Sequence, residues 1–75
     1  MDVKNTQRYI DIGLKIALYR RKNGMTQEQL AEEMGISPGY LSQVETSSVV
    51  QPVSLKTLFA AADILGVPPS KLLEE

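Results

Sequence analysis

The chain has 75 residues, a formal net charge of −1, and neither cysteine nor histidine. This length suffices for one domain. The missing residues exclude disulfides, thiolate metal sites and the usual acid–base group of enzymes at neutral pH. No stretch approaches the roughly 18 apolar residues of a membrane-spanning helix, and the first ten residues lack the apolar run of a signal peptide. We therefore expect a cytoplasmic protein that is not an enzyme and needs no cofactor or metal.

The charge is distributed unevenly along the chain. Residues 1–24 hold six basic and two acidic side chains, whereas residues 25–75 hold two lysines and seven acids. The net charge of the whole chain argues mildly against nucleic-acid binding, because domains that bind nucleic acids are usually basic. The local field counts for more than the total, so the basic first third keeps this function open.

Cap and turn residues predict five helices, the first of them over residues 6–24. Apolar residues at helical spacing mark its inner face: Ile12, Ile16 and Tyr19. A second helix is expected between Thr26 and Gly35, because Thr26 and Gln29 have the spacing of a capping box. Its apolar face contains Leu30, Ala31 and Met34.

A third helix is expected to start at the cap Ser37, with Pro38 in its first position and Leu41 and Val44 facing inward. A loop separates it from a fourth helix, capped by Ser54 and stopped by Gly66. The expected inner residues of the fourth helix are Leu55, Leu58, Ala61, Ala62 and Leu65. Pro69 opens a short fifth helix with Leu72 and Leu73. No segment alternates at period two, so the predicted class is all-α.

The third helix is expected to present a polar stripe outward. The connection before it runs only from Gly35 to Ser37, which sets the two helices at a steep angle. Small or uncharged residues follow helical spacing on the face opposite the core: Gly39, Ser42, Gln43 and Thr46. Such a face fits a narrow cleft lined with hydrogen-bond donors and acceptors, as the DNA major groove is.

These residues resemble the phage repressor/Cro-type, or XRE-like, helix-turn-helix family. The resemblance covers roughly residues 12–73. It rests on Gln27, Ala31, Gly35, Leu41 and Val44, and on the segments TQEQLAEEMGIS, YLSQVE, SLKTL and ADILGV. It implies a compact five-helix, lambda-repressor-like domain spanning residues 1–75, with the helix-turn-helix unit at about residues 26–46.

The resemblance also implies roles for individual residues. The start of the second helix would meet the DNA backbone, the third helix would enter the major groove, and the loop after it would touch phosphate. The implied DNA-contacting residues are Thr26, Gln27, Ser37, Pro38, Gly39, Tyr40, Ser42, Gln43, Thr46 and Ser48. Arg20 and Glu45 match positions of a buried ion pair. Pro38 and Gly39 depart from the family in lacking a side-chain donor, so few groups would read bases.

Several apolar residues fall outside the expected core faces: Ile10, Leu14, Ala17, Leu18, Phe59, Ala60 and Ile64. Either the chain ends fold back over them, or a second copy covers them. We expect a homodimer, because repressors of this group read half-sites about 34–36 Å apart. The candidate surfaces include Val49, Val50, Phe59, Ile64 and the last helix.

The expected function is a repressor-type transcriptional regulator that binds operator DNA as a dimer. Since the chain ends soon after the fifth helix, regulation is expected from its own concentration or from a protein partner. Antitoxins and restriction–modification controllers share this size and fold. The alternative from another class is a protein-binding module that has lost DNA binding, which the acidic total and the Pro38-Gly39 start favour.

Overall fold

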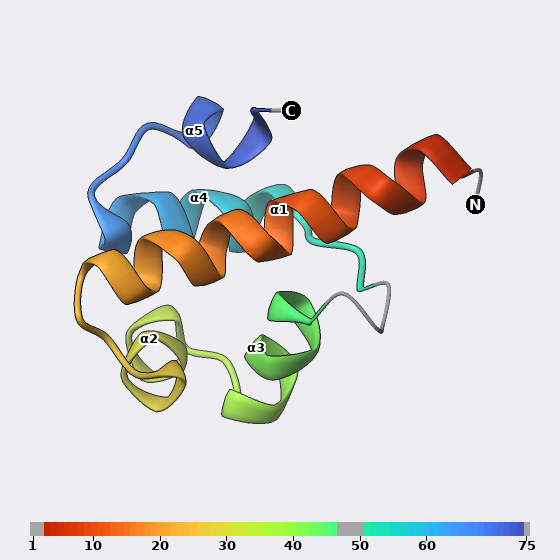
Figure 1. Cartoon of the computed structure of the whole chain (residues 1–75). Coiled ribbons are helices and arrows are strands. Elements are labelled where there is room, and N and C mark those ends of the chain that lie inside the picture. Colours follow the sequence, from red (N-terminus) through yellow and green to blue (C-terminus); the bar gives the residue numbers. More distant parts are fainter. Residues whose placement is uncertain (1–2, 47–50, 75) are drawn as a thin grey trace.

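The computed structural model describes residues 3–46 and 51–74 and contains five α-helices in these ranges (Figure 1). They are α1 (Val3–Lys22), α2 (Gln27–Met34), α3 (Pro38–Glu45), α4 (Leu55–Leu65) and α5 (Pro69–Leu73). The described residues include no strand, which confirms the predicted all-α class. No helix in these ranges combines the length and apolar character needed to cross a membrane.

The long helix α1 organises the molecule. It runs across α4, with α2 and α3 on one side of it and α5 on the opposite side (Figure 1). All five helices contribute to one core of buried side chains: Ile16, Leu30, Ala31, Leu41, Val44, Leu58, Ala61, Ala62, Leu65 and Leu72. Because α1 packs against both α3 and α5, its residues fix where α3 sits.

The predicted caps determine where the helices begin. Thr26, Ser37 and Ser54 each accept a hydrogen bond from the backbone N–H three residues later, which satisfies a group that the helix leaves unpaired. The start expected for α1, near Thr6, is three residues too late, since the helix begins at Val3. Apart from Val3 its first turn is polar, so apolar periodicity gives no signal there.

One predicted core residue is wrong. Leu55 leaves 66% of its surface exposed, although its helical phase matches that of the buried Leu58 and Ala62. Leu55 is the first residue of α4, whereas the buried residues of the helix begin at Leu58. Periodicity gives the direction of a side chain, but it does not say how far the neighbouring helices reach.

The apolar residues outside the predicted core faces divide into two groups. Ala17 is buried, and Ile10, Ala60 and Ile64 are partly buried. Large side chains remain exposed in the monomer: Leu14, Leu18, Leu55, Phe59 and Leu73. Leu73 is half exposed whereas Leu72 is fully buried, so α5 buries one leucine against the core. Val49 and Val50 lie outside the described residues.

Candidate nucleic-acid interface

The turn between α2 and α3 is closed by the backbone. Gly35 adopts a left-handed conformation with φ of 71°, which costs glycine little. The N–H of Ile36 donates to the carbonyl oxygen of Ala31 at 3.0 Å, and Ala31 is fully buried. A larger side chain at Ala31 would therefore displace the packing that holds α2 and α3 in this geometry.

The third helix is anchored along one face. The Ser37 hydroxyl accepts from the N–H of Tyr40 at 3.0 Å, and Pro38 occupies the first turn, where no intrahelical N–H is needed. Leu41 is fully buried and Val44 nearly so. These contacts leave the opposite face of α3 to solvent.

The outward face of α3 contains most of the predicted contact residues. Ser37, Pro38, Gly39, Ser42 and Gln43 are all exposed. A Cβ atom built on Gly39 would meet no other atom within 4 Å, so the fold itself does not require glycine at this position. Apart from Gln43, the residues of this face have short side chains or none, so the face is narrow.

The remaining predicted contacts are placed differently. Tyr40 is partly buried and packs against the core, and Thr46 is partly buried at the C-cap of α3. Thr26 is exposed at the start of α2. The loop residue Ser48 lies outside the described residues. The structure thus brings Thr26 and the α3 face into one helix-turn-helix unit but does not expose every predicted side chain equally.

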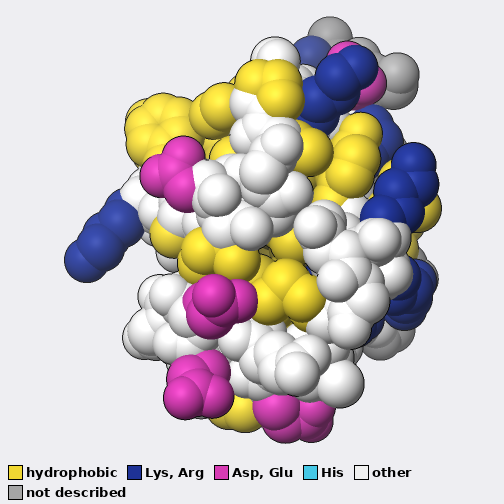
Figure 2. Space-filling model, turned by 90° about the vertical axis from the view of Figure 1, so that its left-hand side faces the viewer, with side chains coloured by type: hydrophobic (Ala, Val, Ile, Leu, Met, Phe, Trp, Pro, Cys, Tyr) yellow, Lys and Arg dark blue, Asp and Glu magenta, His cyan; other side chains and the backbone are white. Residues whose placement is uncertain are grey.

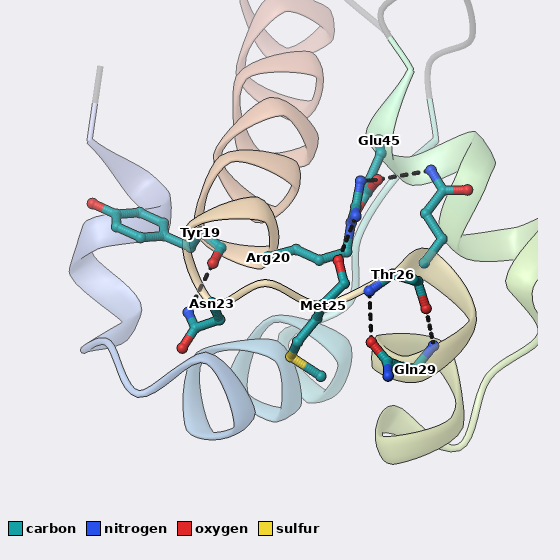
Figure 3. Close-up of polar contacts among 8 residues, drawn as sticks. Tyr19, Arg20, Asn23, Met25, Thr26, Gln29 and Glu45 are labelled. Carbon is teal, nitrogen blue, oxygen red and sulfur yellow. Dashed lines mark hydrogen bonds and ion pairs between the residues drawn. The ribbon is translucent and has the colours of Figure 1, made fainter.

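The expected ion pair between Arg20 and Glu45 is present and buried (Figure 3). Arg20 Nε donates to Glu45 Oε2 at 2.8 Å and Nη2 donates to Oε1 at 3.0 Å, a bidentate arrangement. Arg20 Nη1 also donates to the carbonyl oxygen of Met25 at 2.8 Å. Arg20 therefore links the end of α1 to the end of α3 and to the segment that leads into α2.

Gln27 adds a contact to this pair that the motif did not predict. Its Nε2 donates to Glu45 Oε1 at 2.8 Å. The neighbouring capping box forms as expected: Thr26 Oγ1 accepts from the N–H of Gln29, and Gln29 Oε1 accepts from the N–H of Thr26 (Figure 3). Gln27 thus connects α2 to α3, and its side chain is already oriented by Glu45.

Gly13 is a further residue that the sequence motifs do not single out. A Cβ on Gly13 would clash severely with the carbonyl oxygen of Val44, because the α1 backbone approaches the last turn of α3 there. A glycine inside an otherwise regular helix was the available signal, since glycine weakens helices and needs a reason to be there. Gly13 and Arg20 hold adjacent residues of α3, Val44 and Glu45, from the same helix.

Charge is separated across the molecule. In Figure 2 most of the visible Lys and Arg side chains lie along one edge, another projects from the opposite edge, and most of the visible Asp and Glu side chains lie away from the main basic edge. The acidic side chains of α2 are exposed: Glu28, Glu32 and Glu33. The described residues contain no group of three or more acidic side chains that could hold a metal ion.

Comparison with known proteins places this arrangement among characterised regulators. The sequence matches a family described as helix-turn-helix over residues 16–72. The transcriptional regulator SinR of Bacillus subtilis is 34% identical over 64 residues, which are 85% of this chain and 57% of SinR. The immunity repressor of Bacillus phage phi105 is 36% identical, over 85% of this chain and 43% of the repressor. The chain spans about half the length of these curated relatives.

Solved structures agree with the sequence relatives. SinR in complex with DNA has a TM-score of 0.75 at 33% identity, over 84% of this chain and 98% of that one. ClgR from Corynebacterium glutamicum has a TM-score of 0.80 at 31% identity, over 87% and 67% of the two chains. The restriction–modification controller C.AhdI from Aeromonas hydrophila has a TM-score of 0.77 at 28% identity, over 85% and 94%. The chain therefore belongs to the helix-turn-helix family, in the phage repressor/Cro-type group that its motifs resemble.

Proposed function

We propose that this chain is a DNA-binding transcriptional regulator that inserts α3 into the major groove of an operator. The observation that carries this proposal is the exposed face of α3, where Ser42 and Gln43 project from a helix whose other face is buried. A glutamine can donate to and accept from adenine at once, which is worth about 1–3 kcal/mol of discrimination. Gln43 is therefore the main proposed reader of a base.

Backbone contacts would hold the helix in the groove. Phosphate oxygens bind readily at helix N-termini, where N–H groups are unpaired and the helix dipole is favourable. Thr26 and Gln27 stand at the start of α2, and Ser37 stands at the start of α3. We place Thr46 and Ser48 beside the phosphates that follow α3, while Pro38, Gly39 and Tyr40 would lie along the base edges.

We further propose that the regulator binds a pseudo-palindromic operator as a homodimer in the cytoplasm and represses by occupying promoter sites. SinR has been solved in complex with DNA, and a phage immunity repressor is among the relatives. Because C.AhdI is matched over nearly its whole length, control of a restriction–modification system is a second role within the same class. A regulatory protein partner would act through such a dimer.

A salt titration distinguishes this function from the protein-binding alternative. Each phosphate neutralised contributes a slope of about −0.9 in log K against log salt. For about six phosphate contacts, affinity for a duplex selected from random DNA should fall about 10³-fold between about 50 and about 200 mM salt. Two features favour the alternative, in which the fold binds a protein. The acidic side chains of α2 are exposed, and α3 starts with Pro38 and Gly39, which have no side-chain hydrogen-bond donor.

The control is a scrambled duplex of the same length. The proposal predicts a similar salt slope for both duplexes, and tighter binding of the selected one at every salt concentration. The proposed function would be contradicted if selection from random DNA enriched no sequence and if DNA binding barely responded to salt.

A further inference from the structure

The outer side of α1 has an apolar strip that no other part of the described chain covers. Leu14 and Leu18 leave 45% and 42% of their surfaces exposed, although both are large and apolar. Residues four apart lie on the same side of a helix, so the two leucines are neighbours. A hollow of about 320 Å³ beside them is lined by Asp11, Leu14, Lys15, Leu18 and Glu74. A side chain of another molecule could enter this hollow and cover the two leucines.

Cations border the two leucines. Arg8, Lys15 and Lys22 are spaced by seven residues, which is close to two helical turns, so they form a row along one border. Arg21 lies at the opposite border. The row reaches the end of the α5 segment, where Lys15 Nζ donates to the carbonyl oxygen of Glu74 at 2.6 Å. We call the two leucines and these cations the α1 outer face.

The carboxylates near this face are outnumbered. Asp11 accepts a hydrogen bond from Gln7 Nε2 at 2.9 Å, and Glu74 pairs with Lys71 at 3.3 Å. The cations of the α1 outer face, together with Lys71, exceed these two carboxylates in number within the described part of the chain. The face is therefore positively charged, although the whole chain has a net charge of −1. Such a local field attracts anionic groups.

We propose that the α1 outer face docks an acidic amphipathic helix of a partner protein. Amphipathic helices bind apolar surfaces through anchors spaced by three or four residues, and such anchors would cover Leu14 and Leu18. Carboxylates on both sides of the anchors would then lie beside the row of cations and beside Arg21. Complementary charge speeds the encounter of two surfaces and disfavours wrong partners. The apolar strip thus supplies the contact area, and the cations select an acidic partner.

A second copy of this chain fits the α1 outer face poorly. In an antiparallel pairing of two α1 helices, a border row of one helix runs alongside the same row of the other. Arg8, Lys15 and Lys22 would then lie beside their own counterparts, which is repulsive. A parallel pairing would instead bring Asp11 and Arg21 each beside its own counterpart. The homodimer of the proposed function is therefore left to another surface.

The α1 outer face also points away from the helix that is proposed to read DNA. Gly13 and Arg20, which approach Val44 and Glu45 of α3, are buried on the other side of α1. DNA held on α3 would therefore not cover the leucines, and a partner could bind while the regulator occupies DNA. This last step rests on the proposed function, whereas the docking surface itself does not.

A synthetic peptide tests the proposal on the full chain. The probe is a helix-forming peptide with leucines spaced by three and four residues and glutamates at the flanking positions. Because the surface is small, we expect a dissociation constant of about 0.1 mM, measured from amide shifts of isotope-labelled protein. The largest shifts should fall on residues 14–18 and 71–74, and binding should weaken as salt is added. A control peptide with lysines in place of the glutamates should bind at least about tenfold more weakly.

Matched substitutions separate the apolar and the charged contributions. Leu18→Ser should weaken binding of the glutamate peptide about tenfold, because it removes half of the apolar strip. Lys22→Glu should weaken it about fivefold, because an attraction becomes a repulsion. The corresponding changes on α4, Phe59→Ser and Lys56→Glu, should leave binding within about twofold. Thermal melting followed by circular dichroism confirms that each variant is folded, and Lys22→Glu, at an exposed position, keeps the test decisive if Leu18→Ser is not.

The proposal is overturned if the glutamate peptide does not bind at about 1 mM, or if the lysine peptide binds equally well. Equal weakening by the α1 and α4 variants would also overturn it. Binding to phosphatidylserine vesicles in place of the peptide, lost in Leu18→Ser, would assign the face to a membrane and contradict the proposal. A dimer in sedimentation equilibrium that Leu18→Ser alone dissociates would assign the face to a second copy, with the same consequence.

DNA binding keeps this proposal separate from the proposed function. A chain that binds the glutamate peptide but no selected duplex would support the docking surface and contradict the function. A chain that binds the duplex but not the peptide would do the reverse. If both hold, the peptide should change affinity for the duplex by less than about threefold, because the two surfaces lie on different sides of the molecule.

Discussion

The carboxylate of Glu45 receives hydrogen bonds from two other helices, through Arg20 of α1 and Gln27 of α2. Each of its oxygens has a partner, and no buried side-chain nitrogen or oxygen in the described residues lacks one. A buried charge is tolerated when it is paired and fully hydrogen-bonded. Glu45 therefore fixes the end of α3 without a large apolar side chain.

Removing Arg20 should lower the free energy of unfolding. Arg20→Ala leaves Glu45 buried without its cation, so we expect a loss of about 3–5 kcal/mol in the free energy of unfolding. Chemical denaturation at low protein concentration measures this loss. Arg21→Ala is the matched control, because Arg21 is exposed and should cost less than about 0.5 kcal/mol. Equal effects of the two substitutions would show that the buried pair is not stabilising.

Gln43 should affect specificity more than affinity in general. Gln43→Ala removes the proposed contact with adenine, so discrimination at one base position should fall by about 1–3 kcal/mol. Competition binding with single-base variants of the selected duplex measures it. Gln7→Ala, another exposed glutamine, serves as the control. An unchanged preference at every position would rule out Gln43 as a reader.

At the scale of elements, α3 is positioned by the backbone of α1 as well as by side chains. A methyl group on Gly13 has no room beside the carbonyl oxygen of Val44, whereas one on Gly39 has open space. Gly13→Ala should destabilise the fold by about 1–3 kcal/mol despite the better helix propensity of alanine. Gly39→Ala should be neutral or stabilising by up to about 1 kcal/mol. Comparable unfolding free energies for both variants would contradict the close approach.

The open space at Gly39 also allows the electrostatics of α3 to be changed without altering the fold. Gly39→Lys should add about one phosphate contact, raising affinity for unrelated duplexes and steepening the salt slope by about 0.9. The measurement is the salt dependence of binding to a scrambled duplex. Lys added at the exposed Ser70 of α5, a helix that lies on the opposite side of α1 from α3 (Figure 1), controls for charge alone. If Ser70→Lys has the same effect, α3 is not the surface that meets DNA.

The elements differ in how far the sequence predicts them. Thr26, Ser37 and Ser54 define helix starts by local hydrogen bonds, so their caps were predictable from short motifs. The Arg20–Glu45 pair followed from the resemblance to a family, because nothing local links residues 25 positions apart. The exposure of Leu55 and the bond from Gln27 to Glu45 depend on how whole helices are placed, which periodicity does not give.

At the scale of the whole molecule, a formal charge of −1 must be reconciled with binding a polyanion. Most of the cations visible in Figure 2 lie along one edge, and most of the visible acids lie away from it. Local fields steer binding more than total charge does. The proposed dimer would let two weak contacts act together, so one α3 with few donors need not bind tightly alone.

The most direct test of the central claim is to map which backbone amides respond to DNA. Isotope-labelled protein titrated with a duplex selected from random DNA should show its largest amide shifts at Thr26, at Ser37 and over residues 39–43. Amides of α5 should change little, because α5 lies on the opposite side of α1 (Figure 1). Shifts concentrated at Leu55 to Phe59, with Ser37 and residues 39–43 unaffected, would contradict the claim that the outward face of α3 reads DNA.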